Sequence, residues 1–250
     1  MKFLLSMSLI VSIFVYADDH NDEKPMYEAN VAEYYFSTFK DGKDMDDMMR
    51  WAEKWEKWAT TGDAADANAD YMASMLIPYY GESLDQLDFV WLGINTNPEM
   101  QAIGNDYWVQ NGGKLLEELP VTNAQVVNTW QRTVSETPDG TAGYVVYSDC
   151  KYGEGVTGEQ QYDAWFAFAQ AAKKLGDVAG RKMIWPTMGI TPGWDYDYVQ
   201  AVYTSSITDW GKNWTNFWGA DNDIPEYDAM AAMGGVCENA RSFTIVPVKN

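Results

Sequence analysis

The chain has 250 residues, of which 46% are hydrophobic and 15% aromatic, so it holds enough apolar material for one large domain or two small ones. Acidic residues number 37 and basic residues 17, which gives a formal net charge of -20. This charge argues against nucleic acid as a partner, because phosphate backbones and anionic lipid surfaces repel an acidic protein.

The first segment of the chain is typical of a secretory signal peptide. Lys2 precedes the short apolar run FLLSMSLIVSIFVY, and the small residue Ala17 comes just before an acidic stretch. We therefore predict a signal peptide over residues 1–17 and an acidic tail over residues 18–30. An uncleaved membrane anchor is the alternative, but the run is short for a span of ~20 residues. The mature protein is expected in the periplasm or outside the cell, free of the membrane.

The predicted mature chain begins Asp18-Asp19-His20, which has the form of an amino-terminal copper and nickel motif. A free amine, two backbone nitrogens and the His20 imidazole would supply the square-planar nitrogen set that these ions prefer. The alternative is that a histidine occurs at the third position of the mature chain by chance. His20 is the only histidine in the sequence, so a histidine-based catalytic triad and a multi-histidine zinc site are excluded.

Beyond the tail, hydrophobic periodicity predicts two successive sets of elements in the order strand, helix, strand, strand, helix, strand. The first set has strands at 31–39, 71–79, 87–95 and 124–134, with helices at 44–60 and 98–119. The second set has strands at 143–151, 181–188, 196–205 and 241–248, with helices at 158–175 and 206–218. Turn residues at 138–140 separate the sets, so we divide the folded part into 31–137 and 138–250.

Short matches between the two sets indicate an internal duplication. They follow the same order at a nearly constant offset, as in Ile77-Pro78 with Trp185-Pro186 and Asp88-Phe89-Val90 with Asp197-Tyr198-Val199. Each set has the element order of a ferredoxin-like split unit. The sequence therefore predicts two tandem units of this kind.

Two ferredoxin-like units in tandem resemble the dimeric α+β barrel superfamily. The resemblance implies an α+β fold in which two antiparallel sheets pack face to face as a barrel, with the helices outside. It also implies that one chain supplies what a homodimer usually supplies, so a monomer is expected.

The stretch MMRWAEKWEKWA places three tryptophans on one face of the helix predicted at 44–60. Trp51, Trp55 and Trp58 fall within roughly 60° of each other at 100° per residue, and charged residues take the other side. Helices of the expected barrel cover the outer face of the sheet. We therefore interpret these tryptophans as core packing against that face.

A ligand would meet the opposite face of the sheet, inside the barrel. On the third strands, the set with Val90 and Leu92 is uniformly apolar and suits the helix side. The other set mixes aromatic residues with a polar one, as pocket linings do. The predicted ligand-binding residues are Tyr35, Ser37, Trp91, Trp130, Tyr147 and Gln200. The alternative is a solidly packed barrel core whose polar groups are satisfied locally.

Three functions remain open on the sequence. The leading one is an exported protein that binds a small aromatic or apolar ligand, with no cofactor expected, because haem-dependent relatives generally hold iron through a histidine. The resemblance also implies a cofactor-independent monooxygenase, in which Asp149 would act as a base beside Tyr147 and Trp91. An Asp149 exposed at a strand end is the simpler interpretation. The third function is an interaction module that meets a protein or glycan through the loop residue Trp194.

The two cysteines predict a disulfide. In a ferredoxin-like sheet the fourth strand runs antiparallel beside the first, which brings Cys150 at the end of one strand close to Cys237 at the start of the other. A bond that closes so long a loop would stabilise the fold by ~4 kcal/mol. Neither cysteine is interpreted as a nucleophile.

Overall fold

The computed structural model describes residues 27–81, 86–219 and 222–249. The predicted signal peptide, most of the predicted acidic tail and the candidate metal ligand His20 lie outside the described residues. None of the helices in the described ranges is both long and apolar enough to cross a membrane.

Within the described residues, eight antiparallel strands close into a barrel in the order β1-β3-β2-β8-β5-β7-β6-β4. The strands are β1 (Ala29–Phe39), β2 (Met72–Tyr80), β3 (Phe89–Asn95), β4 (Val121–Ser135), β5 (Tyr144–Lys151), β6 (Gly180–Met188), β7 (Tyr198–Thr204) and β8 (Val236–Lys249). Pairing of β2 with β8 and of β4 with β6 joins the two halves of the chain into one closed sheet. The predicted α+β barrel is therefore confirmed as an architecture.

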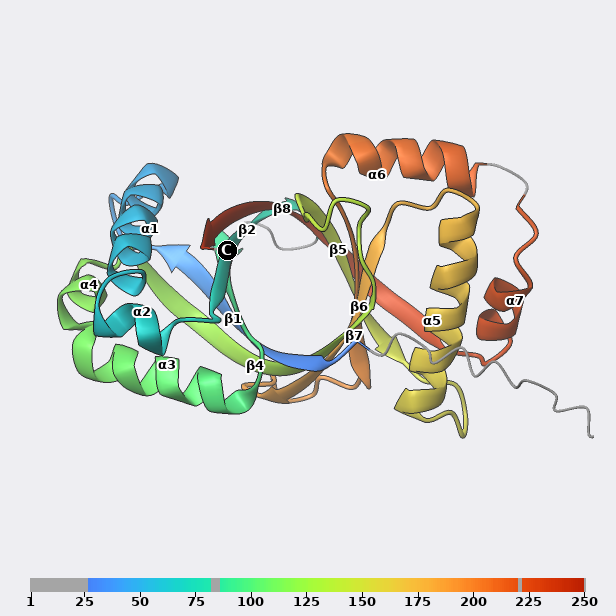
Figure 1. Cartoon of the computed structure of the whole chain (residues 1–250), viewed down its shortest axis with the longest axis horizontal. Coiled ribbons are helices and arrows are strands. Elements are labelled where there is room, and N and C mark those ends of the chain that lie inside the picture. Colours follow the sequence, from blue (N-terminus) through green and yellow to red (C-terminus); the bar gives the residue numbers. More distant parts are fainter. Residues whose placement is uncertain (1–26, 82–85, 220–221, 250) are drawn as a thin grey trace, which may run out of the picture.

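The helices lie outside the barrel in two groups on opposite sides, as Figure 1 shows. One group is α1 (Met45–Ala59), α2 (Asp63–Ala67), α3 (Pro98–Asn111) and α4 (Gly113–Glu118). The other is α5 (Gly158–Lys174), α6 (Ile207–Asn213), the π-helix η2 (Trp214–Trp218) and α7 (Pro225–Ala231). Each group covers mainly the outer face of strands from its own half of the chain, but α1 also contacts β8 and α5 also contacts β4.

Helix ends follow local side-chain chemistry. The Asp44 carboxylate accepts from the Asp47 amide at the start of α1, and Thr157 and Gln160 form a capping box at the start of α5. The single helix predicted at 98–119 is divided at Gly112, where a Cβ would meet the Trp108 ring at 2.5 Å. The short helices α2 and α7 were not predicted, because so few turns carry little periodicity.

Both faces of the sheet are buried, and the faces are the reverse of those predicted from the sequence. Phe89 and Trp91 pack on the outer face under α1, whereas Val90 and Leu92 belong to the cluster inside the barrel. The assignment of Trp91 to the barrel interior is therefore wrong. On β3 the aliphatic side chains of Val90 and Leu92 fit the barrel interior, whereas the broad indole of Trp91 fits the layer between the sheet and α1.

The predicted disulfide is confirmed. The sulfur atoms of Cys150 and Cys237 are 2.11 Å apart, and the two residues are direct partners in the antiparallel pairing of β5 with β8. The bond ties the start of the last strand to the end of β5, across 87 positions of sequence.

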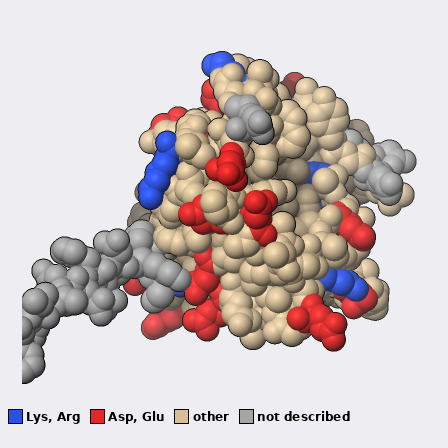
Figure 2. Space-filling view, turned by 90° about the vertical axis from the view of Figure 1, so that its right-hand side faces the viewer, with Lys and Arg blue, Asp and Glu red and all other residues tan. Residues whose placement is uncertain are grey.

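Acidic residues outnumber basic residues by 37 to 17 in the sequence. Figure 2 shows the face over the second group of helices, where acidic groups are more widespread than basic groups. This distribution follows from the formal net charge of -20. A field of this sign favours cations over anions near the surface.

Candidate functional site

The barrel contains a cavity of about 260 Å³. Its wall is mostly apolar and comes from inward-facing residues of both halves, including Phe36, Leu76, Val90, Val127, Ile184 and Phe243. The barrel interior is therefore a cavity and not a solidly packed core. An apolar space with a few polar groups is the usual form of a small-molecule site.

An ion pair lies in the cavity wall. Arg241 Nη2 is 2.9 Å from Asp149 Oδ1, and Asn239 Nδ2 donates to Asp149 Oδ2 at 3.2 Å. Asp149 is only 7% exposed, so the interpretation of a surface aspartate is wrong. Both carboxylate oxygens already accept hydrogen bonds from protein groups. The geometry thus makes Asp149 a partner that orients Arg241, rather than a base that is free to take a proton from a substrate.

A bulge places Asn239 beside this pair. The register between β5 and β8 shifts between Tyr147 and Asp149, and Asn239 has a positive φ of 54°. Asparagine adopts this left-handed conformation more readily than most residues. The bulge re-aims the strand, so that the Asn239 amide reaches Asp149 and its carbonyl oxygen accepts from Arg241 Nη1 at 3.0 Å.

Two tyrosines form another polar part of the wall. The rings of Tyr34 and Tyr147 are 6.1 Å apart and nearly perpendicular, and Gln131 Nε2 donates to the Tyr34 hydroxyl at 3.2 Å. Burial raises the pKa of Tyr147 to about 12 and raises that of Tyr34 as well. Both phenols therefore stay protonated at neutral pH and offer hydroxyl groups to the cavity.

Replacing Tyr147 by phenylalanine is expected to reduce the loss of stability at alkaline pH. The folded-state pKa of about 12 lies above the ordinary value of 10.0, so the folded state holds this proton more tightly. The resulting stabilisation is complete below about pH 10 and is lost as the pH rises toward about 12. Urea unfolding at about pH 9 and about pH 11 measures this loss.

The variant should lose less unfolding free energy between the two pH values than the wild type. The exposed Tyr227, replaced by phenylalanine, is the matched control. An equal loss in the wild type and in Tyr147→Phe would contradict the burial of this phenol.

The loop between β6 and β7 covers part of the cavity. Gln125 Nε2 donates to the carbonyl oxygen of Gly189 at 2.7 Å and to the Thr191 hydroxyl at 3.0 Å, which fastens the loop over β4. Trp194 lines the cavity, with its ring 5.7 Å from that of Tyr196. Trp194 is therefore part of the cavity wall and does not stand free in the loop as the interaction hypothesis requires.

The six predicted ligand-binding residues divide between the two faces of the sheet. Tyr147 lines the barrel cavity. Tyr35, Ser37 and Trp91 instead line a second cavity between the sheet and the first helix group. Trp130 is 41% exposed, and Gln200 alternates with the inward-facing Val199 and Ala201, so both point outwards. The prediction that these five line the barrel is wrong, because the wrong alternating set was chosen.

The residues that the sequence analysis missed are Tyr34, Asn239 and Arg241. Tyr34 directly precedes the predicted Tyr35, so the correct choice of face would have found it. Asn239 and Arg241 gave no comparable signal, because a bulge interrupts the alternation of β8 next to them.

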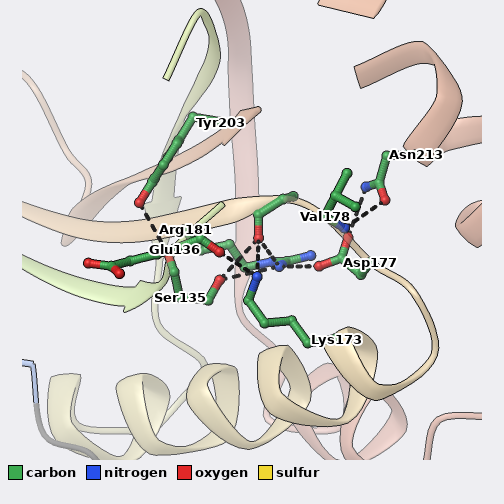
Figure 3. Close-up of polar contacts among 9 residues, drawn as sticks. Ser135, Glu136, Lys173, Asp177, Val178, Arg181, Tyr203 and Asn213 are labelled. Atoms are coloured by element: carbon green, nitrogen blue, oxygen red, sulfur yellow. Dashed lines mark hydrogen bonds and ion pairs between the residues drawn. The ribbon is translucent and has the colours of Figure 1, made fainter. Parts of the chain in front are cut away.

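A buried polar cluster in the second half lies away from both cavities (Figure 3). Arg181 Nη1 is 2.6 Å from Asp177 Oδ2, and Asn213 Nδ2 donates to Asp177 Oδ1 at 2.8 Å. The Val178 amide donates to Asn213 Oδ1 at 3.1 Å. These bonds connect α6 to the start of β6. We interpret the cluster as a structural anchor because its buried polar groups bond to one another and neither of the two cavities includes them.

The fold and the cavity together define the class of protein: an α+β barrel with an internal cavity. No protein-family model matches the chain, and no curated protein matches it in sequence. Solved structures of a chlorite dismutase and of a protein described as heme-binding share the fold, and the superfamily assignment stays a prediction.

Two solved structures illustrate the likeness. A protein from Thermus thermophilus, described as a novel heme-binding protein, aligns with a TM-score of 0.50 and 9% identity over 90% of this chain and 95% of its own. Chlorite dismutase from Candidatus Nitrospira defluvii, solved in complex with imidazole, aligns with a TM-score of 0.50 and 10% identity over 88% of this chain and 92% of its own. At such identities the likeness shows the fold alone.

These structures correct the expectation that no cofactor is needed. A protein described as heme-binding has the same fold, so the fold itself accommodates a cofactor. The residues described here do not fit haem, however. They include no histidine, both cysteines are in the disulfide, and the phenols of Tyr34 and Tyr147 are held protonated by burial. These described side chains therefore provide no ligand for haem iron.

Proposed function

We propose that the protein binds a small apolar or aromatic molecule that carries one acidic or hydrogen-bonding group. The observation that carries this proposal is an apolar cavity inside a closed barrel, with Arg241 and Tyr147 together in its wall. The volume of about 260 Å³ is just below the ~300–1,000 Å³ of drug-sized ligand sites, so the ligand is a compact molecule of one or two rings.

Apolar contacts would supply most of the affinity, because burial contributes roughly 25 cal/mol for each Å² of apolar surface removed from water. The polar groups would set orientation. Arg241 is part-exposed, and its guanidinium carries donors suited to a carboxylate. The Tyr147 hydroxyl would serve as a second donor or acceptor. The oxygenase alternative is not favoured, because Asp149 is committed to its hydrogen bonds with Arg241 and Asn239.

The wider organisation of the chain is part of the proposal. The strand orders β4-β1-β3-β2 and β8-β5-β7-β6 support a duplicated ferredoxin-like unit. A barrel closed within one chain supports a monomer. The disulfide supports an oxidising location, either the periplasm or the cell exterior.

Filling the cavity is expected to abolish binding of a suitable probe. We choose 2-naphthoate, a two-ring carboxylate, measured by isothermal titration calorimetry. Val127 lines the cavity, whereas the adjacent Val126 points outwards and is 38% exposed. Val127→Trp should weaken naphthoate binding by at least about tenfold, and Val126→Trp should leave it unchanged. Equal binding by wild type and Val127→Trp would contradict the barrel site.

A second substitution tests the role of the guanidinium. Arg241→Gln should weaken the binding of naphthoate without weakening the binding of its neutral analogue 2-naphthalenemethanol. Only the carboxylate of naphthoate interacts with the positive charge of Arg241. If both probes weaken equally, Arg241 supports the structure of the cavity and does not recognise an anion.

A further inference from the structure

A second cavity, of about 100 Å³, lies between the sheet and the helices of the first half. Five tryptophans from three elements form much of its wall: Trp51, Trp55 and Trp58 of α1, Trp91 of β3 and Trp108 of α3. The tryptophans of α1 do pack against the sheet, as their spacing predicts. Their rings nevertheless leave a space that no side chain fills.

The tryptophan rings contact one another edge to face around the cavity, and we call these five residues the tryptophan box. The centroids of Trp55 and Trp91 are 4.9 Å apart at 82°, and those of Trp51 and Trp108 are 6.4 Å apart at 87°. Hydrogen bonds hold the box in place: Trp51 Nε1 donates to the Leu115 carbonyl oxygen at 2.8 Å, and Trp91 Nε1 donates to the Tyr71 hydroxyl at 3.1 Å. The rings are therefore pre-organised around the cavity.

A buried carboxylate lies behind this box. Glu33 of β1 is 6% exposed, and it accepts hydrogen bonds from the Tyr35 hydroxyl at 2.9 Å and from Asn105 Nδ2 at 2.6 Å. Tyr35 and Asn105 both line the cavity. No lysine or arginine of the described ranges forms an ion pair with Glu33. A buried charge without a counter-charge is costly, so a cation bound in the cavity would compensate it.

A glycine makes room for this arrangement. Gly93 is the direct strand partner of Glu33, and a Cβ at Gly93 would overlap the Tyr71 hydroxyl. The missing side chain lets Tyr71 lie against the sheet between Glu33 and Trp91. The pKa of Tyr35 is raised mainly by burial and next by the charge of Glu33. The field of the carboxylate therefore reaches the cavity wall.

We propose that this cavity binds a small quaternary ammonium cation, such as the trimethylammonium group of choline. The negative faces of aromatic rings attract such a cation, and tryptophan is the strongest of them. Its methyl groups suit the tryptophan rings of the wall, which also carries polar side chains such as Gln101 and Asn105. Metal ions fit less well, because calcium takes six to eight oxygen ligands and none of the described residues that line the cavity carries a carboxylate. This site is separate from the barrel cavity, so the proposal does not depend on the function proposed for the barrel cavity.

The described residues of the second half are packed differently. There the layer between sheet and helix is filled by the side chains of Tyr162, Trp165, Phe166, Phe168 and Phe217. The box is therefore a feature of the first half and not a general consequence of this fold.

The first test uses the wild-type protein and two probes of equal shape. Choline carries a quaternary nitrogen, and 3,3-dimethylbutan-1-ol has a carbon in its place. We expect choline to change the tryptophan fluorescence and to bind at least about tenfold more tightly than the neutral alcohol in calorimetry. Equal binding of the two probes, or no binding of choline, would overturn the proposal.

The second test removes the carboxylate of Glu33 or the ring of Trp58. Glu33→Gln and Trp58→Leu should each weaken the binding of choline by at least about tenfold. Their controls are Glu117→Gln, which removes an exposed charge nearby, and Trp214→Leu, which removes a tryptophan that is 60% exposed in the other half. A folded Glu33→Gln that binds choline like the wild type would overturn the assigned role of Glu33. If this variant does not fold, the comparison of the two probes on the wild type still decides the proposal.

Discussion

Replacing Asp177 by asparagine is expected to lower the free energy of unfolding by about 3–5 kcal/mol. The ion pair with Arg181 is buried, with side chains 0% and 3% exposed, so loss of the carboxylate leaves an uncompensated guanidinium in the interior. The two Asp177 oxygens now accept hydrogen bonds from Arg181 Nη1 and Asn213 Nδ2. In asparagine an NH₂ group replaces one of these oxygens, so one of the two donors would face another donor. Urea unfolding monitored by circular dichroism measures the loss.

The surface pair of Lys151 and Asp195 is the matched control. Its atoms are also 2.6 Å apart, but its side chains are 42% and 89% exposed. Asp195→Asn should therefore have little effect on the free energy of unfolding. If Asp177→Asn costs no more than this control, the cluster around Arg181 does not anchor α6 to β6. Replacing both buried partners together, with Asp177→Leu and Arg181→Met, should recover much of the loss, because no charge is then left buried.

Removing the disulfide by the double substitution Cys150→Ala and Cys237→Ala is expected to cost about 4–5 kcal/mol. The bond spans 87 positions, and closing so long a loop greatly restricts the unfolded chain. The melting temperature should then fall by roughly 2–4 °C for each kcal/mol lost. Differential scanning calorimetry of both proteins measures the change.

A reducing agent provides the internal control for this experiment. Dithiothreitol should lower the melting temperature of the wild type toward that of the double variant and should leave the variant unchanged. A thiol assay confirms that the bond has been reduced. A fully reduced wild type that melts at its original temperature would contradict a stabilising role for the bond.

Regular elements were predictable where a long segment carries a clear period. Helix α5 was expected at 158–175 and runs Gly158–Lys174, and strand β1 was expected at 31–39 and runs Ala29–Phe39. The helix expected at 206–218 instead passes from α6 into the π-helix η2. Hydrophobic spacing alone does not distinguish these hydrogen-bond patterns over so few residues.

The candidate sites were predictable only in part, because both faces of the sheet are buried. Strand β3 shows the difficulty: Val90 is 1% exposed and Trp91 is 8% exposed, although they point in opposite directions. Alternation reveals that two sets exist but does not say which set faces the barrel. For the same reason the sequence did not identify Glu33 as a buried carboxylate on the helix side of the sheet, next to Tyr35.

The sequence by itself determined the strands and the longer helices, their order, the packing face of α1 and the pairing of Cys150 with Cys237. These features depend on local periodicity and on the topology that the element order implies. Only the tertiary structure decided which side chains meet in a cavity. That outcome depends on barrel closure, on the bulge at Asn239 and on the space left by Gly93, and each of these arises from contacts between residues far apart in the sequence.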